Sequence, residues 1–485
     1  MRFYITTTLP YVNADLHMGH ALEFVRADII ARYKRMSGFE VFFNTGADEH
    51  GMKIYRQAEK EGKDPQAYAD FYADRMKGLI NLLGLSDHNF IRTTSAAHIA
   101  SAQEFWKRCD TAGYIYKKNY KAKYCVGCES EKTDSELVDG RCPDHPNLKI
   151  ELIEEENYFF KFSEFQGRLL EMYKEIPDFV IPDFRFNEIK AFVARGLEDF
   201  SISRLKSKMP WGIEVPGDPD HTMYVWFDAL VNYISAIGWP CPAEARQGEG
   251  GPSDKECEFY KWWPVTQYCG KDNLRYQSAV WQAMLMAAGI SPSKQIVING
   301  FITGAGGIKM SKTLGNIVDP RDIINEYGTD ALRFYLAREI QSFEDSSFTK
   351  EGFQESYNAN LANGLGNLVS RIMKMAEDNL GGPALLSKQI LPVSYTAALE
   401  SFDIKKAAEF IWKEISIQDM YIQETKPFSL IKTDPEGSKK IITHLVEKLH
   451  HIAHMLLPIM PATAEEIKEL IIQNKAPETP LFLRK

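Results

Sequence analysis

The sequence predicts an α/β fold built on a parallel sheet, with a small metal-binding insertion and an all-helical C-terminal region. Three observations support this fold class. The first fifty residues follow a strand–helix–strand pattern, three cysteines and a histidine gather within residues 125–145, and strand-like runs nearly vanish after residue 346. A length of 485 residues allows about three domains at roughly 150 residues each.

The strand–helix–strand pattern begins close to the N-terminus. Short β-rich runs are found at residues 2–6 and 39–43. Gly38 lies where the C-cap of an intervening helix is expected. Two strands joined by a crossover helix are typical of a parallel pair. The apolar side chains that define one face of this helix recur at steps of three and four: Leu22, Val25, Ile29, Tyr33 and Met36.

The insertion is predicted from its cysteines. Cys125 and Cys128 form one pair with two intervening residues, and Cys142 and His145 form another. Three thiolates and an imidazole make a closed tetrahedral zinc site, so we predict one structural Zn²⁺ per chain. A Cys-x-x-Cys redox pair is the alternative, which the nearby second pair disfavours. The remaining cysteines are expected to be isolated, buried and not disulfide-bonded: Cys109, Cys241, Cys257 and Cys269.

The region from residue 346 onward contains long amphipathic patterns and is predicted to be a helical bundle. It carries 16 Lys and Arg against 17 Asp and Glu, so nearly all of the formal net charge of −9 arises in the first 345 residues. An acidic chain of this kind disfavours a broad nucleic-acid binder but allows local contacts.

Composition excludes several classes of protein. With 44% hydrophobic and 25% charged residues, the chain is neither disordered nor collagen-like. No apolar run reaches the roughly 18 residues that a membrane helix needs. No signal peptide is visible in the first fifteen residues, so we expect a cytoplasmic protein.

Two short motifs suggest phosphate chemistry. His17-Met-Gly19-His20 precedes the first predicted helix, whose N-terminus would present backbone N–H groups to a phosphate. The alternative is that both histidines only cap the helix. Lys309-Met-Ser-Lys312-Thr313 follows a glycine-rich segment and could bring two positive charges to a polyphosphate. On its own, that motif is more typical of a solvated basic loop.

Together these motifs resemble the two signatures of class I aminoacyl-tRNA synthetases. Four further segments are similar to the methionyl family of that class, at residues 7–14, 45–51, 224–230 and 270–272. The resemblance extends over the whole chain. It implies a split Rossmann-type catalytic domain, a zinc-knuckle connective insertion and a C-terminal α-helical anticodon-binding bundle. The implied boundaries are 1–115 and 223–300 for the catalytic halves, 116–222 for the insertion, 301–345 for the second-signature region, and 346–485 for the bundle.

The resemblance implies a reaction in two steps. ATP activates L-methionine to methionyl-adenylate, and the methionyl group then passes to the 3′-terminal adenosine of tRNA(Met). Mg²⁺ would accompany ATP. The implied catalytic residues are His17, His20, Lys309 and Lys312, and the implied ATP-binding residues are Gly19, Asp272, Lys309, Ser311, Lys312 and Thr313.

The methionine pocket is implied in the same way. Asp48 would accept the α-ammonium group, although a turn carboxylate is the alternative. Trp226, Ala229, Leu230 and Tyr233 share one helical face, and this periodicity alone indicates only a buried core. A thioether nevertheless packs well against aromatic rings. The remaining implied pocket residues are Leu9, Tyr11, Tyr276 and Gln277.

The sequence also departs from the family. Gln277 and Asn299 stand where histidine is usual, and Gln277 cannot carry a charge. In the bundle, Asn367, Arg371 and Phe428 are implied anticodon contacts, with Phe428 replacing a usual tryptophan. Asn367 and Arg371 could equally form a satisfied polar helix face. The chain ends soon after the bundle, which favours a monomer.

Other functions remain open from sequence alone. One is another class I synthetase, for cysteine or a branched aliphatic amino acid. A second is a catalytically inactive synthetase-like RNA-binding protein. A third is a smaller adenylyltransferase of the same superfamily, for which the helical region and the insertion are too elaborate.

Overall fold

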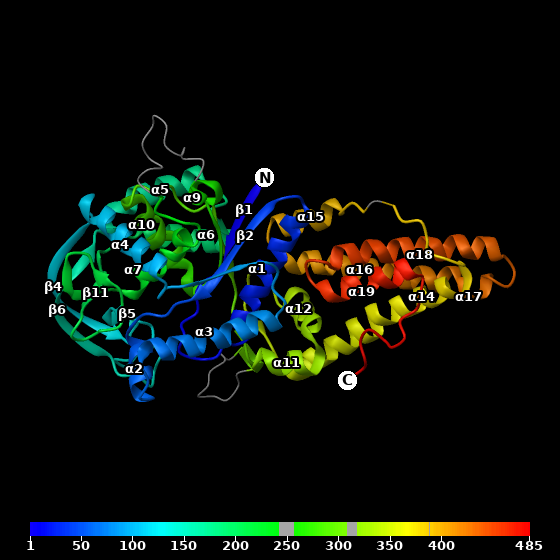
Figure 1. The fold of residues 1–485 in the computed structure, drawn as a ribbon, viewed down its shortest axis with the longest axis horizontal. Coiled ribbons are helices and arrows are strands. Elements are labelled where there is room, and N and C mark those ends of the chain that lie inside the picture. Colours follow the sequence, from blue (N-terminus) through cyan, green and yellow to red (C-terminus); the bar gives the residue numbers. More distant parts are fainter. Residues whose placement is uncertain (242–256, 308–317, 388) are drawn as a thin grey trace. The chain divides into compact units, whose positions relative to one another are not determined.

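The computed structural model describes residues 1–241, 257–307, 318–387 and 389–485 (Figure 1). The chain divides into two compact units. The first contains Met1–Leu16, Gly38–Asn81 and Asp87–Ile298, and the second contains His17–Ser37, Leu82–Ser86 and Asn299–Lys485. The five-part division expected from the sequence stays a prediction.

A six-stranded sheet forms the centre of the first unit. The strand order is β3-β2-β1-β12-β13-β7, and β1 pairs in parallel with both β2 and β12. The strands are β1 (Arg2–Thr6), β2 (Glu40–Ala47), β3 (Asn89–Arg92), β7 (Val180–Ile181), β12 (Thr266–Gly270) and β13 (Gln295–Asn299). The predicted parallel sheet is therefore confirmed. Its edge strand β7 lies within residues 116–222, the segment expected to be an insertion.

Helices and an aromatic core complete this unit. Phe105 stacks on Trp281 with ring centroids 5.6 Å apart, and both rings are fully buried. The helices are α2 (Met52–Lys60), α3 (Pro65–Leu82), α4 (Ala96–Thr111), α5 (Gln166–Glu175), α6 (Asp183–Ala194), α7 (Val225–Ala229), α8 (Asn232–Ser235), α9 (Glu258–Trp262) and α10 (Trp281–Ala287), with short 3₁₀ turns at Asp134–Glu136 and Phe162–Phe165.

Two antiparallel sheets also belong to the first unit. The strand orders are β5-β4-β6-β8 and β10-β11-β9. The long pairing of β4 with β6 runs from Ile115 opposite Phe160 to Tyr124 opposite Glu151. The strands are β4 (Ile115–Cys125), β5 (Ser130–Lys132), β6 (Glu151–Phe160), β8 (Phe200–Ser201), β9 (Ser203–Leu205), β10 (Glu214–Val215) and β11 (Asp218–Met223).

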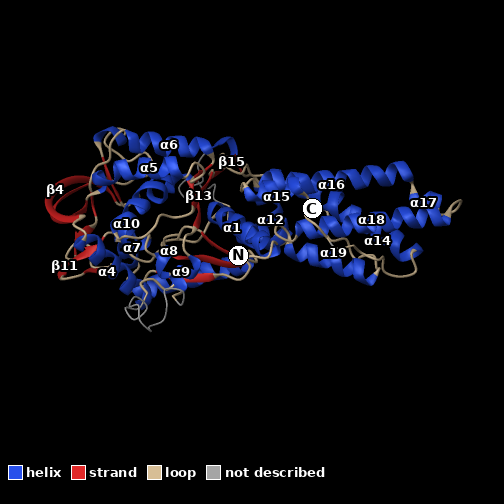
Figure 2. Cartoon of the chain, turned by 90° about the horizontal axis from the view of Figure 1, so that it is seen from above, coloured by secondary structure: helices blue, strands red, loops and turns tan. Residues whose placement is uncertain are grey.

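The second unit is mostly helical, as predicted. After residue 347, the described part of the chain contains only helices and loops, and α14, α16, α18 and α19 lie side by side (Figure 2). The helices are α1 (Met18–Met36), α11 (Pro320–Tyr327), α12 (Thr329–Arg338), α13 (Lys350–Ser356), a π-helical segment (Tyr357–Gly366), α14 (Asn367–Asn379), α15 (Val393–Glu400), α16 (Ile404–Thr425), α17 (Pro427–Leu430), α18 (Pro435–Leu456) and α19 (Pro461–Gln473). Two short strands, β14 (Ile302–Thr303) and β15 (Ser346–Ser347), pair in parallel.

Buried arginines link distant segments of the second unit. Arg333 donates to Asp28 Oδ2 at 2.7 Å, and both side chains are completely buried. Arg26 donates to Asn299 Oδ1 at 3.0 Å and to the carbonyl of Ser342 at 2.9 Å. Burial acts to raise the pKa of Asp28, but Arg333 and Arg32 hold it below its usual value. The negative charge of buried Asp28 is thus balanced by Arg333 of α12.

The prediction that four cysteines are isolated was wrong for two of them. Cys241 and Cys257 form a disulfide, with Cα atoms 5.9 Å apart. Cys109 and Cys269 are buried and form no disulfide, as expected. The sequence separation of 16 residues does not reveal that the two cysteines lie side by side, because their proximity depends on the surrounding fold. Among the described residues, no helix is both long and apolar enough to cross a membrane.

Candidate active site

The predicted methionine-pocket residues follow strands of the parallel sheet. The sheet's strand order reverses between β1 and β12, and open α/β sheets bind ligands beyond the carboxyl ends of their strands at such a point. Leu9 and Tyr11 follow β1, Asp48 follows β2, and Asp272 follows β12. The fold therefore places four sequence-predicted residues after three neighbouring strands.

Tyr11 and Asp48 are held beside each other by the backbone. The Asp48 N–H donates to the Pro10 carbonyl at 3.0 Å, and the Val12 N–H donates to the Asp48 carbonyl at 3.1 Å. Asp48 is 5% exposed, and its Oδ1 has no hydrogen-bond partner among the described residues. Burial raises the pKa of Asp48 well above its usual value, and the nearby Asp228 and Glu129 raise it further. This carboxylate would be stabilised by a positively charged ligand.

Tyr11, the neighbour of Asp48, belongs to a group of three aromatic rings. Trp226 of α7 stacks on Tyr276 with centroids 3.9 Å apart and an interplanar angle of 6°. The Tyr11 ring meets Trp226 edge-on at 6.5 Å. The Trp226 Nε1 and the Tyr11 hydroxyl are buried without a partner in the described part of the chain. Ala229 and Leu230 follow Trp226 and are buried, whereas Leu9 is half-buried.

Gln277 belongs to a network of buried neutral side chains. Its Nε2 donates to the Tyr233 hydroxyl at 2.8 Å, and its Oε1 accepts from Gln267 at 2.6 Å. Ser293 and Gln282 continue the network. Tyr276 and Gln277 begin a π-helical turn (Tyr276–Val280), a geometry frequent at functional sites. The network fixes the orientation of the carboxamide, so Gln277 functions here as an uncharged donor and acceptor.

Sequence reasoning gave no role to a buried His–Asp–His group. Asp228 of α7 contacts His50 Nδ1 at 2.7 Å and His98 Nε2 at 2.8 Å, and all three are at least nine-tenths buried. His98 also contacts Ser235 at 2.9 Å. His50 and Asp228 lie in two of the segments that carry the family resemblance, but no spacing rule connects either residue with His98.

Asp272 lies in a more open position. It belongs to a 3₁₀ turn (Lys271–Asn273) and is exposed. The Asn273 amide donates to Asp272 Oδ1 at 3.1 Å. An exposed carboxylate beyond the end of β12 is well suited to accept hydrogen bonds from ligand hydroxyls.

In the second unit, His17 and His20 cap α1. His17 Nδ1 accepts from the Gly19 N–H at 3.0 Å, and His20 Nδ1 accepts from the His17 N–H at 3.2 Å. A Cβ atom on Gly19 would lie 2.9 Å from His17 Cε1, so glycine allows this arrangement. Burial and the neighbouring His17 lower the pKa of His20 well below its usual value.

The capping role does not exclude a role in chemistry. Because His20 Nδ1 accepts the His17 N–H, the neutral His20 ring carries its hydrogen on Nε2 and can donate from there. The rings are 4.0 Å apart, and they lie at the N-terminus of a long helix. The second signature cannot be placed, because Lys309, Ser311, Lys312 and Thr313 lie outside the described residues.

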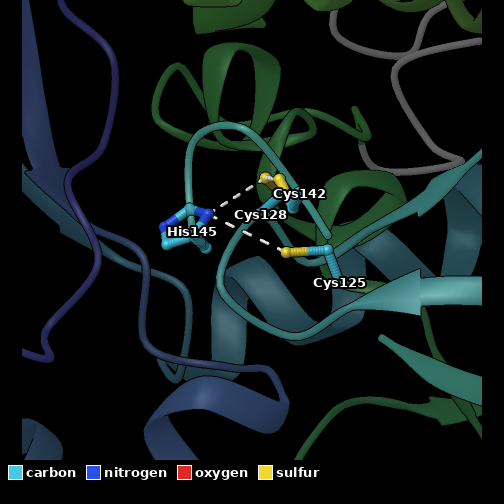
Figure 3. A group of neighbouring side chains, drawn as sticks. All are labelled: Cys125, Cys128, Cys142 and His145. Atoms are coloured by element: carbon cyan, nitrogen blue, oxygen red, sulfur yellow. Dashed lines mark hydrogen bonds between the residues drawn. The ribbon is translucent and has the colours of Figure 1, made fainter. Parts of the chain in front are cut away.

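The predicted zinc ligands come together at the turn between β4 and β5 (Figure 3). The ligand atoms of Cys125, Cys128, Cys142 and His145 all lie within 4.8 Å of one another. Zn–S bonds of about 2.3 Å and Zn–N bonds of about 2.0 Å place tetrahedral ligands roughly this close. The donor set therefore fits a closed structural zinc site.

The predicted anticodon residues lie on two helices of the second unit. Asn367 begins α14 and is exposed, and Arg371 of α14 pairs with Asp419 of α16 at 3.0 Å. Phe428 of α17 is 51% exposed. An exposed apolar ring is available to stack on an unpaired base.

Comparisons with known proteins show the class of this chain. The family described as tRNA synthetases class I (M) matches residues 3–151 and 146–373, and the anticodon binding domain of methionyl tRNA ligase matches residues 384–479. The chain therefore carries the catalytic region of a class I aminoacyl-tRNA synthetase.

Individual relatives narrow this class. The methionine–tRNA ligase of Thermotoga maritima is 39% identical over 96% of this chain and 75% of its own length, and that of Synechocystis is 38% identical over 96% and 88%. The Mycobacterium tuberculosis methionyl-tRNA synthetase in complex with methionyl-adenylate has a TM-score of 0.89 and 33% identity, with full coverage of both chains. The chain belongs to the methionyl-tRNA synthetase family.

Proposed function

We propose that the chain activates L-methionine with ATP, giving methionyl-adenylate and pyrophosphate, and transfers the methionyl group to the 3′-terminal adenosine of tRNA(Met). The observation that carries this proposal is the buried Asp48 carboxylate beside Tyr11, whose ring contacts Trp226, which stacks on Tyr276. An amino acid with an ammonium group and an apolar thioether chain matches this combination of charge and aromatic surface.

In the proposed pocket, three groups of residues contact different parts of the amino acid. Asp48 accepts the α-ammonium group. The thioether side chain of methionine packs against six residues: Leu9, Tyr11, Trp226, Ala229, Leu230 and Tyr276. Tyr233 and Gln277 supply the polar atoms near the sulfur, and their network carries no charge. A thioether needs no counter-ion, so a neutral carboxamide at residue 277 suits this substrate.

On the ATP side, the reaction needs positioning and charge neutralisation more than covalent catalysis. The methionine carboxylate attacks the α-phosphate, and pyrophosphate leaves. His17 and His20 donate from Nε2 to phosphate oxygens, Lys309 and Lys312 neutralise the leaving group, and Asp272 holds ribose hydroxyls. Gly19, Ser311 and Thr313 contribute backbone and hydroxyl contacts. Mg²⁺ bound with ATP supplies further positive charge.

The helical region is proposed to read the tRNA anticodon. Phe428 stacks on an exposed base, while Asn367 and Arg371 form polar contacts from α14. The pairing of Arg371 with Asp419 orients the guanidinium before RNA binds. We also propose that the chain works as a monomer in the cytoplasm, and that its zinc is structural.

ATP–pyrophosphate exchange tests the activation step. We expect exchange with methionine and little with cysteine, isoleucine, leucine or valine. Lys312→Ala should lower the methionine-dependent rate about 100-fold, the typical effect of removing one group that stabilises transition-state charge. Lys406→Ala is the matched control, because Lys406 is exposed on α16.

The outcomes separate the alternatives. A preference for cysteine or a branched aliphatic amino acid would assign the chain to another class I specificity. Absence of exchange with every amino acid, in a protein that still binds tRNA, would indicate an inactive RNA-binding relative. Normal exchange by Lys312→Ala would remove Lys312 from the mechanism.

A further inference from the structure

Glu129 occupies an unusual position beside the zinc site. It directly follows Cys128 in the turn between β4 and β5, and its backbone has a positive φ of 50°. Few residues other than glycine adopt this conformation. The side chain is only 1% exposed, and the Glu129 carbonyl accepts a hydrogen bond from the Tyr224 hydroxyl. The turn that holds the metal ligands therefore also directs a carboxylate into the interior of the first unit.

One oxygen of this carboxylate has a structural partner. Oε1 accepts from the Lys53 N–H at 2.6 Å, at the start of α2. Gly51, three residues after Asp48, has a φ of 113° and no room for a side chain, because a Cβ atom there would lie 2.6 Å from Glu129 Oε2. The backbone after Asp48 is thus packed directly against the Glu129 carboxylate.

The other oxygen has no partner. Glu129 Oε2 is buried without a hydrogen bond in the described part of the chain, as are Asp48 Oδ1 and the Tyr11 hydroxyl oxygen. The three groups lie close enough that the charge of Glu129 raises the pKa values of both Asp48 and Tyr11. A buried polar atom left without a hydrogen bond destabilises the fold. Such a grouping is expected where a ligand supplies the missing donors.

Two cations of the chain, Lys53 and Arg204, act electrostatically on Glu129 but leave Oε2 without a hydrogen bond among the described residues. Lys53 Nζ lies over the Tyr11 ring, 5.5 Å from its centroid, and no hydrogen bond from it to Glu129 Oε2 is found among the described residues. An ammonium group has three N–H donors and no acceptor. Asp48 Oδ1 and Glu129 Oε2 are acceptors, and the Tyr11 hydroxyl, which acts on Glu129 as a hydrogen-bond neighbour, can accept as well as donate. The three groups can therefore receive the N–H donors of an ammonium group.

We propose that Glu129 Oε2, together with Asp48 and Tyr11, binds the α-ammonium group of the amino acid. This inference rests on the proposed function. It makes the zinc-binding turn part of the amino-acid site, since the ligand Cys128 and the binding residue Glu129 are neighbours in the chain. The alternative is a purely structural role, in which Glu129 only caps the N-terminus of α2.

Two methionine analogues distinguish binding from capping. Methioninol keeps the ammonium group and lacks the carboxylate, whereas 4-(methylsulfanyl)butanoate keeps the carboxylate and lacks the ammonium group. Their inhibition constants are measured in the exchange reaction of the full chain. Glu129→Gln is the variant, because its carboxamide oxygen still accepts the Lys53 N–H. Glu154→Gln is the matched control, with a side chain 69% exposed on β6.

We expect Glu129→Gln to raise the methionine KM and the methioninol inhibition constant about 10- to 100-fold, the range for losing a hydrogen bond to a charged group. The butanoate constant should change less than about threefold, and zinc should remain at one per chain. Equal weakening of both analogues would overturn the proposal in favour of capping. Unchanged methioninol inhibition would overturn it as well.

Asp48→Asn separates this inference from the proposed function. If Asp48→Asn weakens methioninol and Glu129→Gln does not, the inference fails and the Asp48 assignment stands. If the unaltered chain shows no methionine-dependent exchange, the proposed function itself fails. Methioninol binding to the unaltered chain and both variants is also followed by tryptophan fluorescence, which requires no catalysis, and the same loss is expected in Glu129→Gln.

Discussion

Gly127 lies between the first two cysteines of the metal cluster and has almost no space beside it. A Cβ atom there would be 2.4 Å from two carbon atoms of the His145 ring. Real Cβ atoms do not approach a ring this closely, so any side chain at residue 127 displaces the imidazole. At the scale of single residues, the fourth zinc ligand is therefore positioned by a glycine that binds nothing itself.

Gly127→Ala should weaken zinc binding, because the displaced His145 can no longer complete a tetrahedral site. We expect purified Gly127→Ala to contain well under one zinc per chain after dialysis against a mild chelator, while the unaltered protein retains about one. Elemental analysis measures this directly. Gly167→Ala, where nothing lies within 4 Å of the added atom, is the control and should keep its metal. Full zinc retention by Gly127→Ala would contradict this account.

Residue-level prediction from the sequence succeeded where spacing carries the chemistry. The four metal ligands were identified from two local pairs, because a zinc knuckle is built from neighbouring residues. Glu129 was missed, since its importance depends on contacts with Lys53 and Gly51 across the fold. The departures at Gln277 and Asn299 also became interpretable only in three dimensions. Gln277 hydrogen-bonds Gln267 and Tyr233, and Asn299 accepts from the buried Arg26.

Asp228 joins three elements of the first unit. Its carboxylate on α7 contacts His98 of α4 and His50 of the loop after β2. That loop carries Asp48, and α7 carries Trp226. The His–Asp–His group therefore fixes the two elements that supply the ammonium and aromatic contacts of the proposed pocket.

Asp228→Asn should destabilise the protein by about 3–5 kcal/mol at neutral pH, the usual effect of breaking a buried ionic contact. Burial acts to raise the pKa of Asp228, but His50 and His98 lower it overall. A lowered folded-state pKa contributes stability above the unfolded value of about 3.9, and this stability is lost as pH falls through the folded value. The stability difference should therefore stay constant from pH 8 to 5 and shrink only below about pH 4.

Urea unfolding across this pH range measures the difference. Asp220→Asn is the matched control, because Asp220 is exposed in the neighbouring strand β11, and its stability should stay within about 0.5 kcal/mol of the unaltered protein. A difference between Asp228→Asn and the unaltered protein that disappears already at pH 6 would contradict the lowered pKa of Asp228.

At the scale of secondary-structure elements, periodicity predicted the long and regular helices and strands. The first strand, helix and strand and the helical C-terminal region were anticipated because their patterns extend over many residues. The two-residue strand β7 and the sheet order β1-β12-β13-β7 were not, because short strands have no measurable period and pairing order depends on distant contacts. The Cys241–Cys257 disulfide was missed because the proximity of the two cysteines also depends on contacts between distant parts of the chain.

At the scale of the whole molecule, the second unit is assembled from three separate stretches of the chain. Residues His17–Ser37 and Leu82–Ser86 pack with Asn299–Lys485. Arg333 alone donates to Asp28, to the carbonyl of Leu83 and to the carbonyls of Pro458 and Ile459. One buried guanidinium thus joins all three stretches.

A fragment of residues 299–485 should not fold cooperatively by itself. It would lack Asp28 and leave Arg333 buried without its carboxylate, a loss of about 3–5 kcal/mol, and it would expose the apolar surface that α1 covers. We expect a helical far-ultraviolet circular dichroism spectrum with a broad, non-cooperative thermal transition. The full chain measured under the same conditions is the reference. A sharp transition in the fragment at the temperature of the full chain would disprove this expectation.

The contact between Asp28 and Arg333 can form only after a long stretch of the chain has been synthesised. The two residues are 305 positions apart, and a ribosome adding about 5–20 residues per second needs roughly 15–60 seconds to cover that distance. During this interval, the helix that carries His17 and His20 has been made but its arginine partner has not. That helix must stay solvated, or be held by another part of the nascent chain, until α12 emerges. Helix α1 is therefore synthesised well before the arginine that completes its final environment.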